Sequence, residues 1–212
     1  MYFGCLNKSD YICNYNKFVY TMIKFHDVKT TDRELVQSYT LCSDRQNCDL
    51  SFANIISWRF LYNTQIAEVD GFLVFRFYIG HHLAYMAPVW KGEWNELMSE
   101  PFAKVVRQMR DDSITLGHPF LMLGVCTNMV EILENIFPDT FYIKPDRDYF
   151  DYIYTREKLA TLAGKKLQSK RNHCNRFRKT YPNYEYRPLT KDMIPECLAV
   201  EANWRTVTKE DN

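Results

Sequence analysis

The dipeptide Asp70-Gly71 stands between two apolar runs, at 64–69 and 72–79, and limits how this part of the chain can fold. Asp-Gly between such runs is the strongest short-range signal for a β-hairpin, because both central residues of its turn adopt a positive φ. A further apolar run follows at 83–89. We therefore expect three consecutive strands that form an antiparallel meander.

Segments with helical periodicity surround these strands, and they are expected at 34–41, from about residue 51, at 94–116 and at 128–137. In the second of them, Phe52, Ile55, Ile56 and Phe60 form one apolar stripe. The nearly continuous apolar run 120–125 predicts a central strand covered on both faces, and two strand-like stretches flank 146–148. Hairpins followed by a strand–helix–strand unit predict an α+β domain.

The N-terminal residues 1–21 show neither helical nor strand periodicity, and we expect a disordered or artefactual extension there. They lack the continuous apolar core of a secretory signal, and no run in the chain approaches the roughly 20 apolar residues of a membrane span. Seven scattered cysteines without a CxxC pair fit a reducing cytosol. The five histidines do not fall at metal-ligand spacing with any cysteine, so we expect no metal site.

The segment 164–181 concentrates positive charge. It holds seven of the 27 basic residues and no acid, which leaves 20 basic against 26 acidic residues elsewhere. As a helix it would be about 25 Å long. One stripe of that helix would be apolar and would carry Leu167, Cys174, Phe177 and Tyr181.

Three interpretations of this helix are open: a solvated connector without a ligand, a contact with RNA phosphates, or a contact with anionic lipid headgroups. Composition and spacing do not decide between the last two. For a phosphate ligand, we expect contacts from Lys170, Arg171 and Arg176. Lys166 and Lys179 would assist them, and Asn175 would orient the ligand.

Two short loops place opposite charges side by side, at 44–47 and at 146–148. Each is interpreted as a loop-fixing ion pair or helix cap. The alternative is that Arg45 or Arg147 positions a substrate carboxyl or phosphate through the fork of its guanidinium.

The basic run Gly164-Lys-Lys…Lys170-Arg171…Asn175-Arg176, followed by Tyr184-Glu-Tyr186-x-Pro-Leu, resembles the connector of bacterial phosphatidylglycerol lysyltransferase C-terminal-domain proteins, which are similar to Fem-type peptidoglycan aminoacyltransferases. Four further segments and the Asp70-Gly71 hairpin look like the soluble branch of this family, which lacks a membrane flippase part. These segments are Ser43-Asp-Arg-Gln-Asn-Cys-Asp-Leu-Ser-Phe, Trp58-Arg-Phe, Met122-Leu-Gly-Val-Cys126 and Asp146-Arg-Asp-Tyr…Asp151-Tyr-Ile-Tyr154. The resemblance covers about residues 22–204.

The resemblance implies a tandem of two acetyltransferase-like (GNAT) domains, with a mixed, mainly antiparallel sheet flanked by helices. It places the first domain at 22–160, a basic connector helix at 161–183, and the truncated start of a second domain at 184–212. The acetyl-CoA loop Gln/Arg-x-x-Gly-x-Gly/Ala is absent from the sequence, so no cofactor is expected.

The resemblance also implies a reaction. An aminoacyl-tRNA would donate its aminoacyl group to an anionic lipid or a peptidoglycan precursor, in the cytoplasm or at the inner face of the membrane. The donor ester is already activated and needs no protein nucleophile, and no signature of one is found, so catalytic residues stay unassigned. The alternative from another class is a non-catalytic binding module that uses the basic helix on RNA or anionic membrane.

Overall fold

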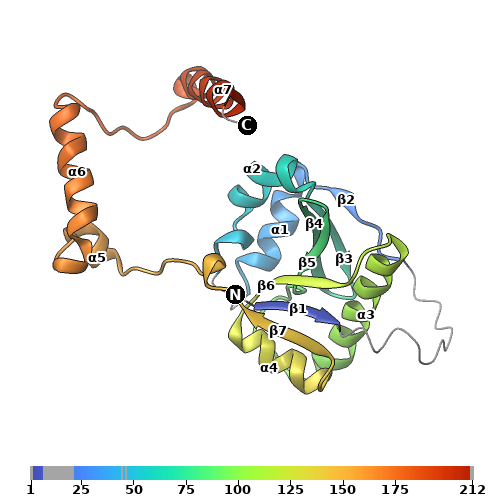
Figure 1. Cartoon of the computed structure of the whole chain (residues 1–212). Helices are drawn as coiled ribbons and strands as arrows, with labels where there is room; N and C mark the ends of the chain where they lie inside the picture. The colour runs from blue at the N-terminus through green and yellow to red at the C-terminus, as the bar shows by residue number, and fades with distance from the viewer. Residues whose placement is uncertain (1, 7–21, 44, 46, 211–212) are drawn as a thin grey trace. The chain divides into compact units, whose positions relative to one another are not determined.

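The computed structural model describes residues 2–6, 22–43, 45 and 47–210. The chain divides into two compact units, Met1–Tyr152 and Ile153–Asn212 (Figure 1). This division falls before the domain boundary that we expected after residue 160. The segment that follows Tyr152 therefore belongs with the basic helix rather than with the sheet domain.

The first unit is built on a seven-stranded sheet with the order β2-β3-β4-β5-β6-β1-β7. The strands are β1 Tyr2–Leu6, β2 His26–Asp27, β3 Gln65–Val69, β4 Phe72–Ile79, β5 His82–Met86, β6 Leu121–Val125 and β7 Phe141–Pro145. Neighbouring strands pair antiparallel except β5 and β6, which pair parallel through Tyr85 with Met122 and Met86 with Leu123. This mixed, mainly antiparallel sheet with flanking helices confirms the expected GNAT-like α+β fold.

The hairpin predicted at Asp70-Gly71 is present. Both residues have positive φ, 47° and 83°, and β3 and β4 pair from Val69 with Phe72 to Gln65 with Arg76. Gly71 has no Cβ to hinder this conformation, whereas Asp70 tolerates it as a short polar residue. Asp70 also forms an ion pair of 2.8 Å with Lys104, which ties the turn to the neighbouring helix.

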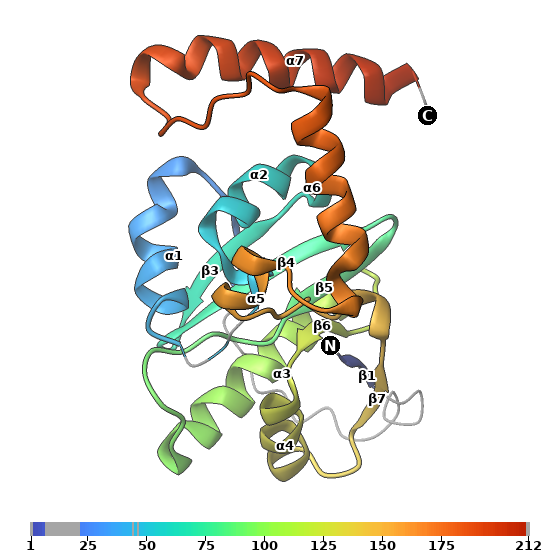
Figure 2. The ribbon, with the colours of Figure 1, turned by 90° about the vertical axis from the view of Figure 1, so that its left-hand side faces the viewer.

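Four helices cover the sheet: α1 Arg33–Thr40, α2 Phe52–Tyr62, α3 Ser99–Thr115 and α4 Thr127–Ile136. Figure 2 shows α1 and α2 side by side over the end of the sheet that holds β3 and β4. Short 3₁₀ turns of the first unit lie at Thr30–Asp32, Cys48–Leu50, Glu96–Met98 and Arg147–Tyr149. The predicted end of the long helix at Gly117 is confirmed, with Gly117 at φ 79°.

Alternation along β4 divides the interior into two cores, because successive side chains of a strand point to opposite faces. Phe72 and Val74 join the core beneath α3 and α4, with Phe102, Val105, Val106, Met109, Met129 and Leu133. Leu73 and Phe75 join the core beneath α1 and α2, with Val36, Tyr39, Leu50 and Ile55. The sheet is thus covered on both faces.

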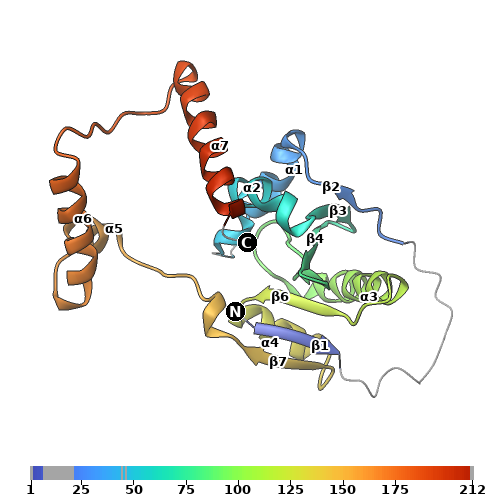
Figure 3. The same cartoon turned by 45° about the horizontal axis from the view of Figure 1, so that its top comes forward.

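Three local expectations are wrong. Tyr2–Leu6, where no element was expected, forms β1 between β6 and β7 (Figure 3); its five residues are too few to show a periodicity, and its pairing with two neighbours is long-range. The second strand expected beside 146–148 is absent, because the residues after Phe150 pair with no strand. Phe60, expected on the apolar stripe of α2, is 59% exposed.

The second unit contains α5 Arg156–Thr161, a 3₁₀ turn at Lys165–Leu167, α6 Gln168–Thr180, a 3₁₀ turn at Lys191–Met193 and α7 Ile194–Glu210. The basic helix therefore begins at Gln168, later than expected, after Gly164 with φ 88° has turned the chain. Within the described parts of both units, no helix combines the length and the hydropathy needed to cross a bilayer.

Candidate phosphate-binding helix

The start of α6 is fixed by Arg171. Its guanidinium donates to the carbonyl oxygen of Leu162 and, over 2.7 Å, to that of Gly164. Leu162 adopts a left-handed conformation with φ 49°, so α5 ends there. Arg171 is half-buried and closes the turn between α5 and α6. Of the cations predicted to contact phosphate, this one has a structural role.

Lys170 also lies away from the other predicted contacts. Its Nζ lies 5.4 Å from the ring centroid of Tyr154, within the range of a cation–π interaction. At 3.6 residues per turn, Lys170 is on the same side of α6 as Phe177. The ring of Phe177 packs against Tyr181 in a tilted arrangement and against Tyr184 edge to face, each with centroids 5.1 Å apart, and all three rings are about half exposed.

The opposite side of α6 forms what we call the polar face, which consists of Asn172, Asn175, Arg176 and Lys179. Helical geometry places these four side chains within an arc of about 100°. All four are exposed, and α6 carries no acidic residue. Arg178 lies about 60° outside this arc and donates to Oδ1 of Asn175 over 3.4 Å. Two cations beside two amides can bind the oxygens of a phosphate.

The helix thus brings together three of the predicted residues, Asn175, Arg176 and Lys179. Lys170 lies on the other side of the helix, and the guanidinium of Arg171 is bound to the carbonyls of Leu162 and Gly164. Lys166 is exposed in the 3₁₀ turn before α6. The sequence indicated the charge of this segment, and helical periodicity already separates Lys170 from these three residues. The contacts of Arg171 with two backbone carbonyls are visible only in the structure.

Arg45 is 8% exposed, and its guanidinium fixes a loop. Its Nη1 and Nη2 donate to the carbonyl oxygens of Ala87 and Pro88 over 3.0 and 2.7 Å. The guanidinium carbon also lies 5.3 Å from the ring centroid of Trp90. Its neighbours at positions 44 and 46 lie outside the described residues.

Arg147 is exposed in the 3₁₀ turn Arg147–Tyr149. The turn is capped by Asp146, whose Oδ1 accepts a hydrogen bond from the backbone nitrogen of Asp148 over 3.1 Å. Asp146 therefore acts as the helix cap that we expected in this loop. The side chain of Arg147 lies on the surface.

A cavity of about 470 Å³ lies between α1, α2 and the loop that joins them. Arg45 lines it, together with Arg33 and Gln37 of α1. Neither of these α1 residues was predicted from the sequence to line a site. Their spacing of four along a helix would have placed them on one side, but the sequence alone does not show that α2 faces them.

Cys48 and Asp151 form a contact that the sequence did not predict, because 103 positions separate them. The Cys48 thiol donates to Oδ1 of Asp151 over 2.9 Å, and the Cys48 backbone nitrogen donates to Oδ2 over 3.2 Å. The hydrogen bond to Asp151, followed by desolvation, raises the pKa of Cys48 to about 12. The thiol is therefore protonated at neutral pH, the reverse of an activated nucleophile.

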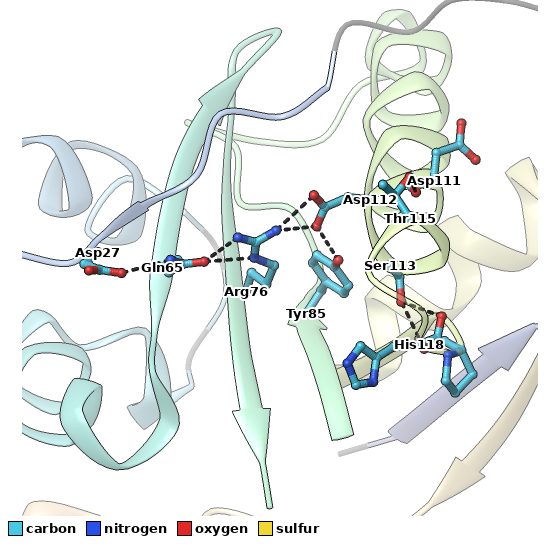
Figure 4. A network of polar contacts seen from close by, with 10 residues as sticks. Asp27, Gln65, Arg76, Tyr85, Asp111, Asp112, Ser113, Thr115 and His118 are labelled. Carbon is cyan, nitrogen blue, oxygen red and sulfur yellow. Dashed lines mark hydrogen bonds and ion pairs between the residues drawn. The ribbon is translucent and has the colours of Figure 1, made fainter. Parts of the chain in front are cut away.

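A polar network crosses the first unit and is drawn in Figure 4. Arg76 contacts Gln65 on one side and Asp112 on the other, and Gln65 in turn donates to Asp27 over 2.9 Å. Tyr85 donates to Asp112 over 2.6 Å. Desolvation, reinforced by this hydrogen bond, raises the pKa of Tyr85 above its ordinary value. The described members satisfy one another, so the network stabilises the fold.

Comparison with known proteins places these features in context. The sequence profile of the family described as "Phosphatidylglycerol lysyltransferase, C-terminal" matches residues 42–212. A crystal structure of a conserved protein of unknown function from Bacteroides thetaiotaomicron is 52% identical, with a TM-score of 0.72 over 90% of this chain. The chain spans 62% of that protein's length. No curated protein matches the chain.

Proposed function

This chain belongs to the phosphatidylglycerol lysyltransferase C-terminal family, and from that premise we propose that it takes part in aminoacyl transfer from an aminoacyl-tRNA to a lipid or cell-wall acceptor. The donor in such a reaction is a polyanion, so a protein that uses it needs a surface that neutralises phosphates. The polar face of α6 has the required chemistry, and it is the observation that carries the proposal.

The composition of α6 supports a phosphate ligand over a merely solvated helix. Solvated helices usually mix both signs of charge, because pairs of opposite charge three or four residues apart stabilise them. In α6 the cations have no acidic partner on the helix itself. Like charges that repel one another are stabilised when an anion binds, and Arg176 and Lys179 are both exposed for such binding.

The chemistry of transfer sets what else is needed. The acceptor amine or hydroxyl must lose a proton, and the oxyanion of the tetrahedral intermediate must be stabilised. The aminoacyl ester supplies its own leaving group, the terminal ribose hydroxyl of the tRNA. We therefore propose substrate-binding residues only, with Arg176 and Lys179 as the principal phosphate contacts and Asn175 beside them.

The proposal is tested by binding of unacylated tRNA to the purified chain, followed by fluorescence anisotropy at low salt. The variant is Arg176→Ala/Lys179→Ala, and the matched control is Lys24→Ala/Lys144→Ala, which removes the same charge from exposed lysines of the first unit. We expect the α6 variant to bind tRNA about tenfold more weakly, and the control to bind almost as well as the unchanged chain.

A parallel titration with phosphatidylglycerol vesicles separates the alternatives. Binding to vesicles alone, lost in the α6 variant, would indicate a module that uses the helix on an anionic membrane. Equal loss of tRNA binding in the variant and in the control would indicate that only overall charge matters, and the proposed contacts would be wrong.

A further inference from the structure

We propose that the cavity between α1 and α2 is a binding site for a small phosphate ester. This site lies wholly within the first unit and is independent of α6. Its volume of about 470 Å³ is within the range of pockets that hold small organic ligands. The inference therefore concerns a second ligand, separate from the polyanion proposed above.

The charge of the lining is the first reason. Arg33 of α1 and Arg45 of the α1–α2 loop each contribute a guanidinium group, and the described residues that line the cavity include no carboxylate. Arg45 is held rigidly, because two backbone carbonyls and the Trp90 ring fix its guanidinium. A buried, fixed cation stabilises an anion more than a mobile surface cation does, since it loses little entropy on binding.

The uncharged polar groups of the lining are the second reason. Gln37, Thr40, Asn47 and Ser51 supply two amides and two hydroxyls around the same space. Ser51 precedes α2, but its hydroxyl does not cap that helix, so the helix does not use it. Gln37 accepts from Nε of Arg33 over 3.1 Å, which orients the guanidinium along α1. Amides and hydroxyls of this kind suit the alcohol side of a phosphate ester.

Phosphate esters of this size occur free or as the headgroup of a lipid. The experiment therefore uses two probes, glycerol 3-phosphate in solution and phosphatidylglycerol vesicles, with phosphatidylcholine vesicles as the blank. Binding is located by amide chemical shifts in nitrogen-15 spectra of the whole chain. The variant is Arg33→Gln, which changes an exposed side chain and leaves the buried Arg45 in place. The matched control is Arg110→Gln on α3.

We expect glycerol 3-phosphate to shift the amides of Ser51, Phe52 and Ala53 saturably, and Arg33→Gln to weaken its binding about tenfold through the loss of a charge-assisted hydrogen bond. Shifts at these amides with phosphatidylglycerol vesicles alone, lost in Arg33→Gln, would also support the site and would assign the ester to a lipid. Shifts that lie elsewhere, or equal binding by Arg33→Gln and Arg110→Gln, would overturn the inference. Neither outcome changes the proposal that α6 binds tRNA, because α6 does not line this cavity.

Discussion

Nη1 of Arg76 on β4 lies 2.8 Å from Oδ2 of Asp112 on α3, and this ion pair connects the sheet to the helix that covers it. Only 16% and 5% of the two side chains are exposed. The same carboxylate oxygen accepts a hydrogen bond from the hydroxyl of Tyr85. A buried charge whose partner is removed keeps its desolvation penalty without the compensating attraction. The stability of the first unit therefore depends on Asp112.

Asp112→Ala should lower the free energy of unfolding by about 3–5 kcal/mol, because Arg76 would stay inside without its counter-charge. Urea denaturation followed by circular dichroism measures this change. The neighbouring Asp111→Ala is the control, since Asp111 forms an exposed pair with Arg110 and should cost less than about 1 kcal/mol. Equal losses in the two variants would contradict a special role for the buried pair.

Alkaline pH should destabilise the protein through Tyr39 and Tyr85. Burial raises the pKa of both phenols above about 10, and hydrogen bonds to Glu68 and Asp112 raise it further. The unfolded chain therefore loses these protons at a lower pH than the folded chain. Their contribution to stability is complete below about pH 10 and is lost as the pH rises beyond it.

The measurement is a series of urea midpoints between about pH 8 and about pH 11. Tyr85→Phe should be less stable than the unchanged chain at the lower end of the series, yet its midpoint should fall less steeply. Tyr152→Phe, at an 88% exposed position, should follow the unchanged chain. An identical slope for Tyr85→Phe would show that this phenol does not contribute.

Local signals in the sequence predicted most of the first unit. The Asp70-Gly71 turn, the central strand at β6 and the end of α3 at Gly117 each follow from a few adjacent residues. Features that depend on partners distant in sequence were missed. β1 pairs with two strands more than a hundred positions away. The residues after Phe150 have a composition that suits a strand, but they pair with no neighbouring strand.

The same division applies to the candidate site. The charge of α6 is a property of its composition, and the sequence indicated it. The role of a single cation is a property of geometry: the guanidinium of Arg171 binds the carbonyls of Leu162 and Gly164. An arginine that binds backbone carbonyls has the same local sequence pattern as one that binds a phosphate. Only the structure distinguishes the two.

Cys48 should react slowly with iodoacetamide although it is exposed. The hydrogen bond to Asp151 raises the pKa of its thiol to about 12, and the thiolate is the reactive form. Mapping of alkylated peptides by mass spectrometry should show Cys48 at least about tenfold slower than the exposed Cys42 near neutral pH. Asp151→Asn should accelerate Cys48 alone. Rates for Cys48 that match those of Cys42 would contradict the contact.

Arg171→Lys should loosen the turn between α5 and α6, because a lysine keeps the charge but cannot reproduce two directed hydrogen bonds from one guanidinium. Hydrogen exchange should become faster in peptides around 159–171, and tRNA binding should change little. Lys179→Ala is the converse control: exchange at the turn should be unchanged and tRNA binding weaker. The reverse outcome would mean that Arg171 contacts phosphate and Lys179 does not.

The salt dependence of tRNA binding shows whether the polar face of α6 contacts phosphates. The slope of the logarithm of the association constant against the logarithm of salt concentration counts the phosphates that the protein neutralises. Arg176→Ala/Lys179→Ala should reduce this slope by about 1.5, the value for two lost phosphate contacts. Lys24→Ala/Lys144→Ala should leave it unchanged. Equal slopes for the α6 variant and the unchanged chain would contradict the claim that this face binds phosphate.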